Sequence, residues 1–399
     1  MSTIHFTLLW RHSDWGLYGR RHEVFGRELA RHPDVGSVVH VEAVSPKQIL
    51  NHFRGWRSAS TEALRDARAR QLRKVIPPTR LVEAANNLYV TSFVIASKRN
   101  YPASVAAFNE HIVRWQARRF ARARRRLLPG RHCTVAYLPA PYIRTALNVL
   151  PTDFLVADLI DDVPAQVEDD QLRHVYRESY RRVLPECDWI ISTSQHVAET
   201  FRSYANGDID VIRNGVRIND FASSENERPS GVGYVGNINQ TMNVDLVDHV
   251  TKQLPDTTFK FAGPVHPSMK SKIDSLQTRP NIEFLGALAK SEVPAFLRQC
   301  RVLFSIKRND DITAGNDSMK IYEYLATGRP VVSTPVSPAD RLSDVVYTAY
   351  GKKEFVEKLQ QALTEDNPDR MQRRLEVARE NAWEKRIDSF VDTVLSRLK

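Results

Sequence analysis

The chain has 399 residues, of which 42% are hydrophobic and 26% are charged. This composition is typical of a soluble globular protein and excludes a disordered one, and the length suits two domains better than a single core. No apolar run approaches the roughly 20 residues that cross a bilayer, and the opening residues, MSTIHFTLLWRHSDW, lack the layout of a signal peptide. The three cysteines, Cys133, Cys187 and Cys300, are far apart, which predicts neither disulfides nor a metal site. We therefore expect a cytoplasmic protein.

Positive charge is concentrated in the N-terminal part of the chain. Residues 1–150 carry 25 Lys and Arg against 9 Asp and Glu, whereas the remainder carries 32 against 38. A basic half of this kind predicts an anionic partner. Nucleic acid, an anionic membrane surface and a lipid-diphosphate substrate all fit, and so does a solvated basic face without a specific partner.

Short β-branched runs alternate with helical patterns along most of the chain. The expected strands are 4–10, 37–44, 88–94, 134–139, 154–160 and 188–194, followed by a second series at 231–238, 259–264, 282–288, 301–307 and 330–336. Such alternation predicts parallel sheets covered by helices on both faces. Because there are two series, we expect two doubly wound, Rossmann-like α/β domains that face a cleft.

The polar stretch 211–231 lies between the two series and predicts the linker. One long helical pattern at about 368–398 ends the chain, and it exceeds an ordinary covering helix. We expect its last part to cross back to the N-terminal domain, which would bury Trp383 and Phe390. The predicted division is therefore an N-terminal domain at 1–210, a C-terminal domain at 211–375 and a crossover helix at 376–399 that packs on the N-terminal domain.

The stretch NDSMKIYEYLATGRPVV predicts a short helix with a binding site at its N-terminus. Asp317 or Ser318 is a suitable N-cap, and Gly-Arg-Pro ends the helix. The helix end offers free N–H groups to an anion, and Lys320 in the first turn adds a positive charge. Glu323 lies one turn further on the same face, where a carboxylate can accept two hydrogen bonds from a ribose diol. The alternative is an exposed Lys–Glu pair on a surface helix.

The place of this helix in the second series favours the binding site. It follows the expected strand 301–307 through a polar loop, so it begins at the carboxyl edge of a sheet, where open α/β folds bind ligands. Gly236 and Asn237 form a turn after the first strand of the series, and FAGPVHP follows the second. Each turn alone is also explained as a tight connection, but all three meet one edge.

Residues 230–340 resemble the nucleotide-sugar-binding domain of GT-B glycosyltransferases. The resemblance is carried by YVGNINQTMNVDLV, FKFAGP, NIEFLGAL, EVPAFLRQCRVLFSIK and NDSMKIYEYLATGRPVVSTP, in which K-x-x-E-Y-L-A-x-G-x-P-V-V is the most specific run. NDSMK, with GALAKSEVPAFLRQCRVLF before it, is most similar to the xanthan-type glucuronosyltransferase group of exopolysaccharide assembly. Those are cytoplasmic enzymes that extend lipid-diphosphate-linked oligosaccharides. The resemblance implies a GT-B fold and a nucleotide-sugar co-substrate with UDP as the expected leaving group, and it implies no metal or other cofactor.

The resemblance also implies roles for particular residues. Ser318, Met319 and Lys320 match the segment that contacts UDP in that group, and Glu323 matches the residue that many GT-B enzymes use for the donor ribose. The full predicted donor site comprises Gly236, Asn237, Lys307, Asn316, Ser318, Met319, Lys320 and Glu323, with Arg308 as a further candidate for the diphosphate.

Two departures from the pattern bear on stereochemistry. Many retaining GT-B enzymes carry a second Glu where this chain has Gly315, and an Arg and a Lys where it has Asn237 and Met242. The charge of the diphosphate then falls on Lys320. An inverting transfer is favoured, and a retaining transfer on the same fold is the alternative.

An inverting transfer needs a general base on the acceptor hydroxyl. The apolar run FLVADLI contains Asp158 and is followed by Asp161 and Asp162. A partly desolvated carboxylate beside a second one has a raised pKa suited to base work. The corresponding strand of the xanthan-type enzymes ends in a catalytic Asp, which the resemblance carries over to Asp161, with Asp162 as the second candidate. The alternative is a cluster that caps the following helix.

The turn LLWRHSDWGLYGRRHEVF joins the first strand to a helix through two glycines, which permit close backbone approach. GT-B enzymes use this loop near the donor phosphate and the acceptor. The predicted acceptor and cleft residues are His12, Asp14, Trp15, Gly16, Gly19 and Arg20. His12 is also a candidate base, although a lone His near a strand end is more often structural.

The stretch RWQARRFARARRRLLPGR (114–131) predicts a basic helix with Trp115 and Phe120 among the arginines. Reversible docking on an anionic membrane is one interpretation, and a solvated basic face is the other. Nucleic acid is not expected, because no recognition motif accompanies the stretch.

The main prediction is a metal-independent glycosyltransferase that moves a sugar from a UDP-sugar to a lipid-linked or other saccharide acceptor. It would work in the cytoplasm, as a peripheral protein on the inner face of the plasma membrane. The alternatives are a retaining GT-B enzyme, a nucleotide-sugar 2-epimerase and a non-enzymatic basic binding protein.

Overall fold

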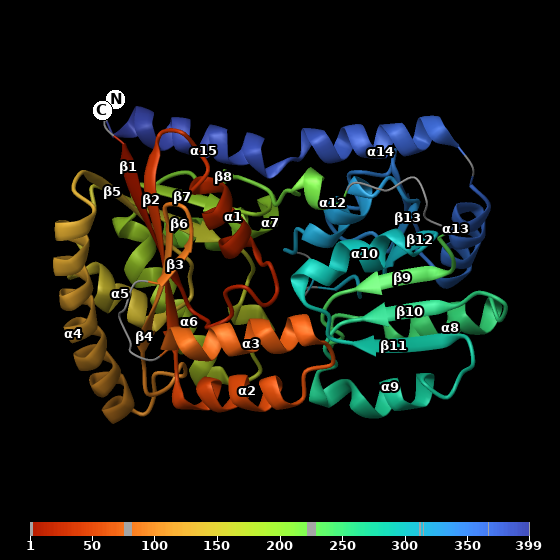
Figure 1. Ribbon diagram of the computed structural model, residues 1–399, viewed down its shortest axis with the longest axis horizontal. Helices are drawn as coiled ribbons and strands as arrows, with labels where there is room; N and C mark the ends of the chain where they lie inside the picture. Colours follow the sequence, from red (N-terminus) through yellow and green to blue (C-terminus); the bar gives the residue numbers. More distant parts are fainter. Residues whose placement is uncertain are drawn as a thin grey trace. The chain divides into compact units, whose positions relative to one another are not determined.

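The computed structural model describes residues 3–75, 82–221, 229–310, 313, 315–365 and 367–398. The chain divides into two compact units (Figure 1). Unit 1 comprises Met1–Ala59, Arg65–Arg213 and Arg386–Lys399, and unit 2 comprises Ser60–Leu64 and Asn214–Lys385. The chain passes from unit 1 to unit 2 between Arg213 and Asn214, within the polar stretch that predicts a linker.

Unit 1 contains an eight-stranded sheet in the order β3-β4-β2-β1-β5-β6-β7-β8. Its strands are β1 (Ile4–Trp10), β2 (Val35–Val44), β3 (Val82–Ala85), β4 (Leu88–Val94), β5 (Arg131–Ala136), β6 (Phe154–Leu159), β7 (Trp189–Ser192) and β8 (Asp210–Val211). All neighbouring pairs are parallel except β3 with β4. The chain builds outward from β1 through β2 and β4, then returns to add β5 on the other side of β1. The topological switch point therefore lies between β1 and β5.

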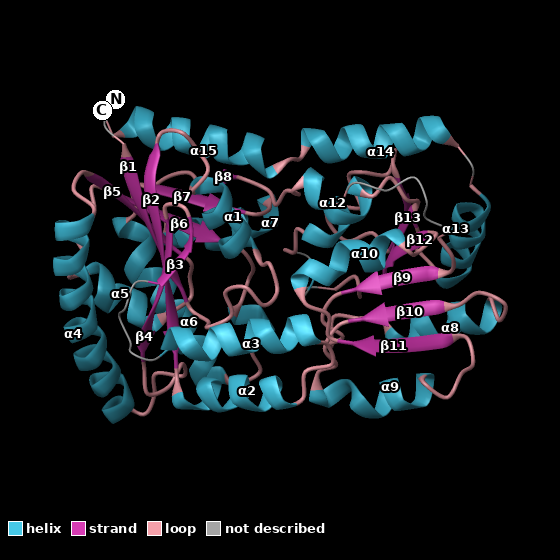
Figure 2. Cartoon of the chain, viewed as in Figure 1, coloured by secondary structure: helices cyan, strands magenta, loops and turns pink. Residues whose placement is uncertain are grey.

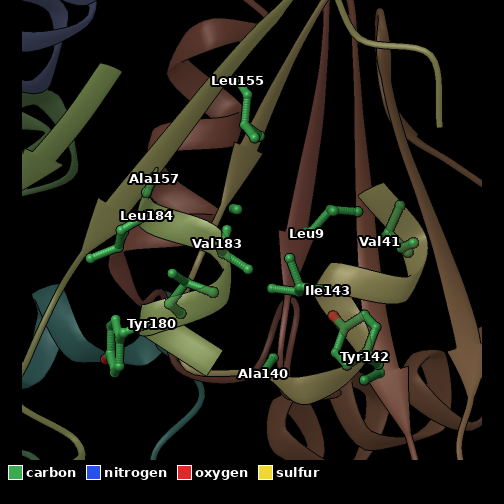
Figure 3. Close-up of a cluster of buried hydrophobic side chains, with 14 of the residues drawn as sticks. Leu9, Val41, Ala140, Tyr142, Ile143, Leu155, Ala157, Tyr180, Val183 and Leu184 are labelled. Carbon is green, nitrogen blue, oxygen red and sulfur yellow. The ribbon is translucent and has the colours of Figure 1, made fainter. Parts of the chain in front are cut away.

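The helices of unit 1 cover its sheet (Figure 2). They are α1 (Arg21–Leu29), α2 (Pro46–Arg57), α3 (Glu62–Val75, whose first residues cluster with unit 2), α4 (Ala103–Leu127), α5 (Pro141–Leu147), α6 (Asp170–Val183), α7 (Gln195–Phe201) and most of α15 (Trp383–Arg397). Leu9 and Val41 from the sheet pack in one buried cluster with Ile143 of α5 and Val183 of α6 (Figure 3). Each such side chain contributes about 1.5–3 kcal/mol when it is fully buried, so this cluster fixes the carboxyl ends of β1 and β5.

Unit 2 contains a six-stranded, all-parallel sheet in the order β11-β10-β9-β12-β13-β14. Its strands are β9 (Val232–Val235), β10 (Phe259–Ala262), β11 (Ile282–Gly286), β12 (Val302–Ser305), β13 (Val331–Ser333) and β14 (Val346–Thr348). Its helices are α8 (Val244–Gln253), α9 (Lys270–Leu276), α10 (Val293–Arg298), α12 (Met319–Ala326), α13 (Lys352–Thr364) and α14 (Pro368–Glu380). This strand order is that of a doubly wound dinucleotide-binding fold, with the switch point between β9 and β12.

Six short 3-10 helices complete the described elements. They are η1 (Pro164–Gln166), η2 (Leu184–Glu186), η3 (Arg202–Tyr204), η4 (Ile218–Asp220), η5 (Pro267–Met269) and η6 (Lys290–Glu292).

The predicted fold class, two doubly wound parallel sheets, is confirmed. The long helical pattern at the end of the chain is not one helix, because α14 and α15 are separated at Asn381 and Ala382. There Val216 forms a parallel bridge with Ala382, and its backbone N–H donates to Asn381 O at 3.1 Å. These bonds compete with the helical ones, so the prediction of a single helix is wrong.

The last part of α15, from Arg386, belongs to unit 1. Phe390 is fully buried, and its ring centroid lies 4.9 Å from that of Phe25 and 5.3 Å from that of Trp189. Trp383 is also fully buried, but it lies in unit 2 against Gly215.

A search of the described helices for one that is long and apolar enough to cross a membrane finds none.

Candidate functional site

In unit 2, α12 begins beside the switch point of the sheet. Ser318 is its N-cap residue, and its side chain forms no capping hydrogen bond with the first turn of the helix as described. The first-turn N–H groups of an α-helix have no acceptor within the helix. Together with the Ser318 hydroxyl, they can therefore take an anion, as the sequence predicts. Asn316 and Met319 on either side are half-buried.

Asp317 holds the start of α12 from inside the unit. Its buried carboxylate accepts hydrogen bonds from the Asn214 N–H at 2.7 Å and the Tyr322 hydroxyl at 3.0 Å, and pairs with Arg341 at 3.2 Å. Asp317 is therefore an anchor, and of the two predicted N-cap residues Ser318 takes the role.

The amine of Lys320 points at the turn after β9. Lys320 Nζ lies 3.0 Å from the Tyr234 hydroxyl, to which it donates, and 4.2 Å from the centroid of the Tyr234 ring. A Cβ atom at Gly236 would lie 2.6 Å from the same nitrogen. Burial lowers the pKa of Lys320 to about 8, against the opposing effect of Glu323. A bound anion would raise the pKa of Lys320 again and hold the amine protonated.

Gly236 and Gly263 bring the turns after β9 and β10 into close contact. Gly236 has φ of +142° and Gly263 has φ of +147°, backbone conformations that residues other than glycine rarely adopt. A Cβ atom at Gly263 would lie 1.9 Å from Gly236 O. Because these two positions carry no side chain, the backbones of the two turns meet beside the amine of Lys320.

Glu323 is nearly buried and forms an ion pair with Lys290, which lies in η6 after β11. Sequence reasoning missed Lys290. Its ammonium also lies over the ring of Phe221, 5.6 Å from the centroid. The ion pair holds the carboxylate of Glu323 in place. Glu323 and Lys320 lie one turn apart on α12.

The remaining predicted donor residues lie around the same switch point. Asn237 follows Gly236, and its backbone carbonyl accepts from the Tyr234 hydroxyl at 3.1 Å. Lys307 follows β12 and forms an antiparallel bridge with Met242. Met242 is buried. The site therefore brings together residues from the ends of β9 and β12 and from α12.

In unit 1, the three carboxylates around the end of β6 have different environments. Asp158 is fully buried and pairs with buried Arg21 at 2.8 Å, and burial raises its pKa in spite of that arginine. It is a structural group inside the sheet. Asp162 accepts a hydrogen bond from the Ala165 N–H of η1 at 3.1 Å. Asp161 lies two residues after the last residue of β6, and both Asp161 and Asp162 are half-buried. The role of Asp161 as the base stays a prediction.

The loop after β1 is organised around buried carboxylates. Glu42 Oε1 accepts the backbone N–H groups of Asp14 and Trp15, each at 2.7 Å, and both residues are buried. Burial would raise the pKa of Asp14, but Arg20 and His22 hold it well below its usual range. Asp14 and Trp15 therefore anchor the buried side of the loop to Glu42.

Of the other predicted residues of this loop, Gly16 and Arg20 are half-buried and Gly19 is buried. Gly16 has φ of +80° and Gly19 has φ of +57°. The Gly16 N–H donates to Glu23 at 2.8 Å, and Arg20 pairs with Asp14 at 3.3 Å while remaining partly exposed. Their predicted contact with the acceptor stays a prediction.

His12 lies between two cationic side chains. Arg11 Nε donates to His12 Nε2 at 3.0 Å, and His12 Nδ1 lies 2.6 Å from Lys98 Nζ. Burial, followed by the charges of Lys98 and Arg11, lowers the pKa of His12 well below its usual value. Arg11 and Lys98 were not predicted from the sequence.

The basic stretch lies mostly on α4. Its exposed arginines are Arg114, Arg118, Arg119, Arg122, Arg125 and Arg126. Trp115 is 48% exposed among them, with the Arg119 guanidinium 4.9 Å from its ring centroid. Arg124 differs, because it is buried and donates to Thr7 Oγ1 at 2.9 Å. The helix thus has a cationic outer face and one structural arginine.

Within the described ranges, no group of three or more His, Cys, Asp or Glu side chains is arranged to hold a metal ion. The prediction that no metal takes part stays a prediction.

Comparison with known families identifies one matching segment. Residues 229–365, about a third of the chain, match the glycosyl transferases group 1 family. A Bacillus subtilis (strain 168) protein assigned to teichuronic acid biosynthesis, the glycosyltransferase TuaH, is 21% identical over 182 residues. That match covers 43% of this chain and 46% of the relative, so the chain spans about half the length of the curated relative that it matches. A group 1 glycosyltransferase is therefore supported, whereas the xanthan-type subgroup is not confirmed.

Solved structures resemble the whole chain. A trehalose-phosphate synthase (UDP-forming) from Burkholderia vietnamiensis has a TM-score of 0.66 at 13% identity, covering 99% of this chain and all of its own. Anabaena HepE in complex with UDP and glucose has a TM-score of 0.65 at 13% identity, with the same coverage. At these identities the likeness shows the fold alone, which is GT-B.

Proposed function

With the group 1 glycosyltransferase segment at residues 229–365 as the premise, we propose that this chain transfers a sugar from a UDP-sugar to a saccharide acceptor. The donor binds at the carboxyl edge of the unit 2 sheet. The acceptor binds the basic unit 1 and carries its saccharide on a lipid. The reaction inverts the anomeric centre, with Asp161 as the general base, and it takes place on the cytoplasmic face of the membrane.

One observation carries the donor site. Lys320 Nζ lies beside Gly236 at the switch point, next to the N-terminus of the helix that presents it. A cation in the first turn of a helix is disfavoured by the helix dipole, so a diphosphate at this place satisfies both the amine and the helix end. A solved neighbour of the same fold holds UDP, which supports uracil as the base of the donor.

The departing diphosphate sets what the residues must do. As the bond between the anomeric carbon and the diphosphate oxygen breaks, negative charge builds on that oxygen, and Lys320 with the α12 N–H groups stabilises it. Asp161 removes the proton from the acceptor hydroxyl as the new bond forms. Lys320 and the helix end supply the positive charge that a divalent cation provides elsewhere, so we propose that no metal is needed. Gly315 stands where a retaining enzyme usually has a second Glu, which supports inversion.

The first test is a nucleotide screen in buffer with EDTA. Thermal-shift and saturation-transfer NMR measurements are made with UDP, GDP and CDP, followed by intact nucleotide sugars. We expect UDP to raise the Tm most, and the NMR signal to come from both the uracil and the ribose protons. If none of the three diphosphates binds, or if binding requires a divalent metal, the corresponding part of the proposal is wrong.

We further propose that α4 docks the protein on anionic lipid. Six exposed arginines surround a half-exposed Trp115, and Phe108 and Leu127 on the same helix are 57% and 60% exposed. Arginine beside an interfacial aromatic is the composition of a helix that lies in the headgroup region. A lipid-linked acceptor would be met at that surface.

Replacing Arg118, Arg119 and Arg122 by glutamine is expected to weaken vesicle binding about 100-fold. Each cation near an anionic surface contributes about 1 kcal/mol, so three together contribute about 3 kcal/mol. The measurement is flotation with vesicles containing phosphatidylglycerol, at low and at high salt. The matched control replaces the exposed arginines 177, 181 and 182 of α6, which changes the net charge equally. Binding that ignores salt, or equal loss in both variants, would contradict docking through α4.

A further inference from the structure

A pocket opens at the switch point of the unit 1 sheet. Its volume is about 350 Å³, including its open mouth. Its lining comes from the segments that follow β1, β4 and β5 and from α4, α5 and α6: Arg11, His12, Ile95, Ser97, Lys98, Asn100, Asn109, Pro139, Ala140, Pro141, Tyr142 and Tyr176. Carboxyl edges at switch points are where open α/β sheets bind their ligands. The pocket is built entirely from unit 1.

The lining of this pocket combines apolar and cationic side chains. Ala140 and Tyr142, both labelled in Figure 3, continue the buried cluster under α5. Arg11, His12 and Lys98 are the basic residues of the lining. Arg11 Nη1 is a buried nitrogen with no hydrogen-bond partner among the described residues. A buried guanidinium N–H without an acceptor costs free energy, so the pocket is short of an anion.

The contact between His12 and Lys98 leads to the same conclusion. Since Arg11 Nε donates to His12 Nε2, the proton of the neutral imidazole is on Nδ1, 2.6 Å from Lys98 Nζ. Lys98 Nζ can accept a hydrogen bond from that N–H only when its amine is uncharged. Burial lowers the pKa of Lys98 to about 7, with Arg11 and Arg20 acting in the same direction and Asp14 and Glu42 against it. The amine of Lys98 is therefore partly uncharged in the free protein, and a bound anion would raise its pKa and hold it protonated.

The loop that carries Lys98 is held rigidly. Asn109 of α4 accepts from the Ala96 N–H at 2.7 Å and donates to Ser97 O at 2.8 Å. Gln116, two turns further along α4, bonds both the N–H and the carbonyl of Val94. Buried polar side chains that bind the backbone of a loop fix the loop in place. The position of Lys98 is therefore set before any ligand arrives.

We propose that this pocket binds an anionic oxygen group of the acceptor, a phosphate or a carboxylate, between Arg11 and Lys98, while the apolar side chains of the lining contact the attached sugar or chain. That the bound anion belongs to the acceptor rests on the proposed function, whereas the presence of an anion site does not. The nearby base candidates fit this assignment. Burial raises the pKa of Tyr180, and the charges of Arg11, Asp161 and Asp162 all act on it, so the pocket and the residues after β6 lie near the same tyrosine. A phosphate would come from a lipid diphosphate and a carboxylate from a uronic acid.

Competitive acetylation with mass spectrometry tests this on the unmodified protein. At pH 7 an amine with a pKa of about 7 is half uncharged, so Lys98 should react much faster than exposed Lys47. The probes are methyl phosphate, glucuronate and neutral glucose, with sodium chloride at equal ionic strength as the control. UDP is added in a parallel series, in which Lys320 is the amine that should be protected.

We expect methyl phosphate or glucuronate to slow acetylation of Lys98 at least tenfold, with no change at Lys47. The protection should weaken as the pH rises from 7 to 9, because binding then has to supply a proton to the amine. Stronger protection by methyl phosphate points to a lipid-linked phosphate, and stronger protection by glucuronate to a uronic acid. Either result supports the anion site.

Two outcomes would overturn the proposal. In one, glucose or sodium chloride protects Lys98 as well as the anions do. In the other, no anion protects Lys98 although UDP protects Lys320, which leaves the proposed function standing and removes this inference. If UDP fails to protect Lys320 while an anion protects Lys98, the donor assignment fails and the anion site remains.

A pair of arginine variants localises the effect. Arg11→Met should abolish the protection of Lys98 by anions, whereas Arg99→Met should leave it unchanged. Arg99 is next to Lys98 in the chain but its side chain is 63% exposed, and it does not line the pocket. Protection of Lys320 by UDP reports in both variants that the protein is folded. Unchanged protection of Lys98 in Arg11→Met would contradict the role given to Arg11.

Discussion

Replacing Lys320 by methionine is expected to weaken UDP binding about ten- to 150-fold. A hydrogen bond to a charged group is worth about 1.5–3 kcal/mol, and methionine keeps the volume of the side chain while removing its charge. Turnover should fall further, by about 10²–10³-fold, because the charge on the leaving diphosphate grows in the transition state. Isothermal titration with UDP and a coupled UDP-release assay measure the two effects.

The pH dependence adds a second readout. The pKa of Lys320 is about 8 in the free protein, so UDP affinity of the wild type should fall as the pH rises above 8, where the amine loses its proton. Lys320→Arg keeps its charge at every pH used and should lack this fall. Lys252→Met, which removes an exposed lysine on α8 paired with Asp248, is the control and should bind UDP normally. Normal binding by Lys320→Met would refute the donor site as proposed.

Replacing Asp161 by asparagine is expected to leave UDP binding intact and to reduce turnover about 10²–10⁴-fold, the range that a general base contributes. Asparagine keeps the shape and the hydrogen-bonding oxygen but cannot take the proton. The assay is transfer to the acceptor at saturating donor, with UDP affinity measured in parallel.

Asp162→Asn is the matched control for that experiment. Asp162 accepts a hydrogen bond from the Ala165 N–H of η1, and the side-chain oxygen of asparagine can accept the same bond, so the variant should remain folded and active. If Asp162→Asn loses turnover and Asp161→Asn does not, the base is Asp162. If both turn over normally, His12 becomes the candidate to test.

The parts of the fold that were predicted correctly depend on periodicity and local chemistry. The first strand, 4–10, is β1 as expected, and the helix predicted from NDSMKIYEYLATGRPVV is α12. Both carry strong signals, a mostly apolar run in one and a cap with a Gly-Arg-Pro stop in the other. The short strands β3, β8 and β14, of two to four residues, were not predicted.

The break between α14 and α15 could not be read from the sequence, because its cause lies far away in the chain. Residues 381 and 382 fit a helix locally, and the competing partner is Val216. A tertiary bond of this kind overrides helical propensity without leaving a local signature.

The candidate site was predicted unevenly for a similar reason. Three carboxylates around the end of a buried strand drew attention to this region, and the resemblance to the xanthan-type enzymes chose Asp161 among them. Arg11 directly follows β1 and carries a similar local signal that was not used. Lys98 and Lys290 lie four residues beyond the ends of β4 and β11, so position after a strand does not mark them. What no rule could supply is their pairing, since the contacts of Lys98 with His12 and of Lys290 with Glu323 join distant segments.

The close packing of Gly236 on Gly263 has a consequence for protein engineering. The turns that these glycines begin are also tied by backbone hydrogen bonds, from Ile238 N–H to Pro264 O at 3.0 Å and from His266 N–H to Ile238 O at 2.9 Å. Neither turn can change its path while the other keeps its own. Grafting a foreign sequence into only one of them should therefore distort both, and a donor-specificity chimera has to exchange the two loops as a single cassette.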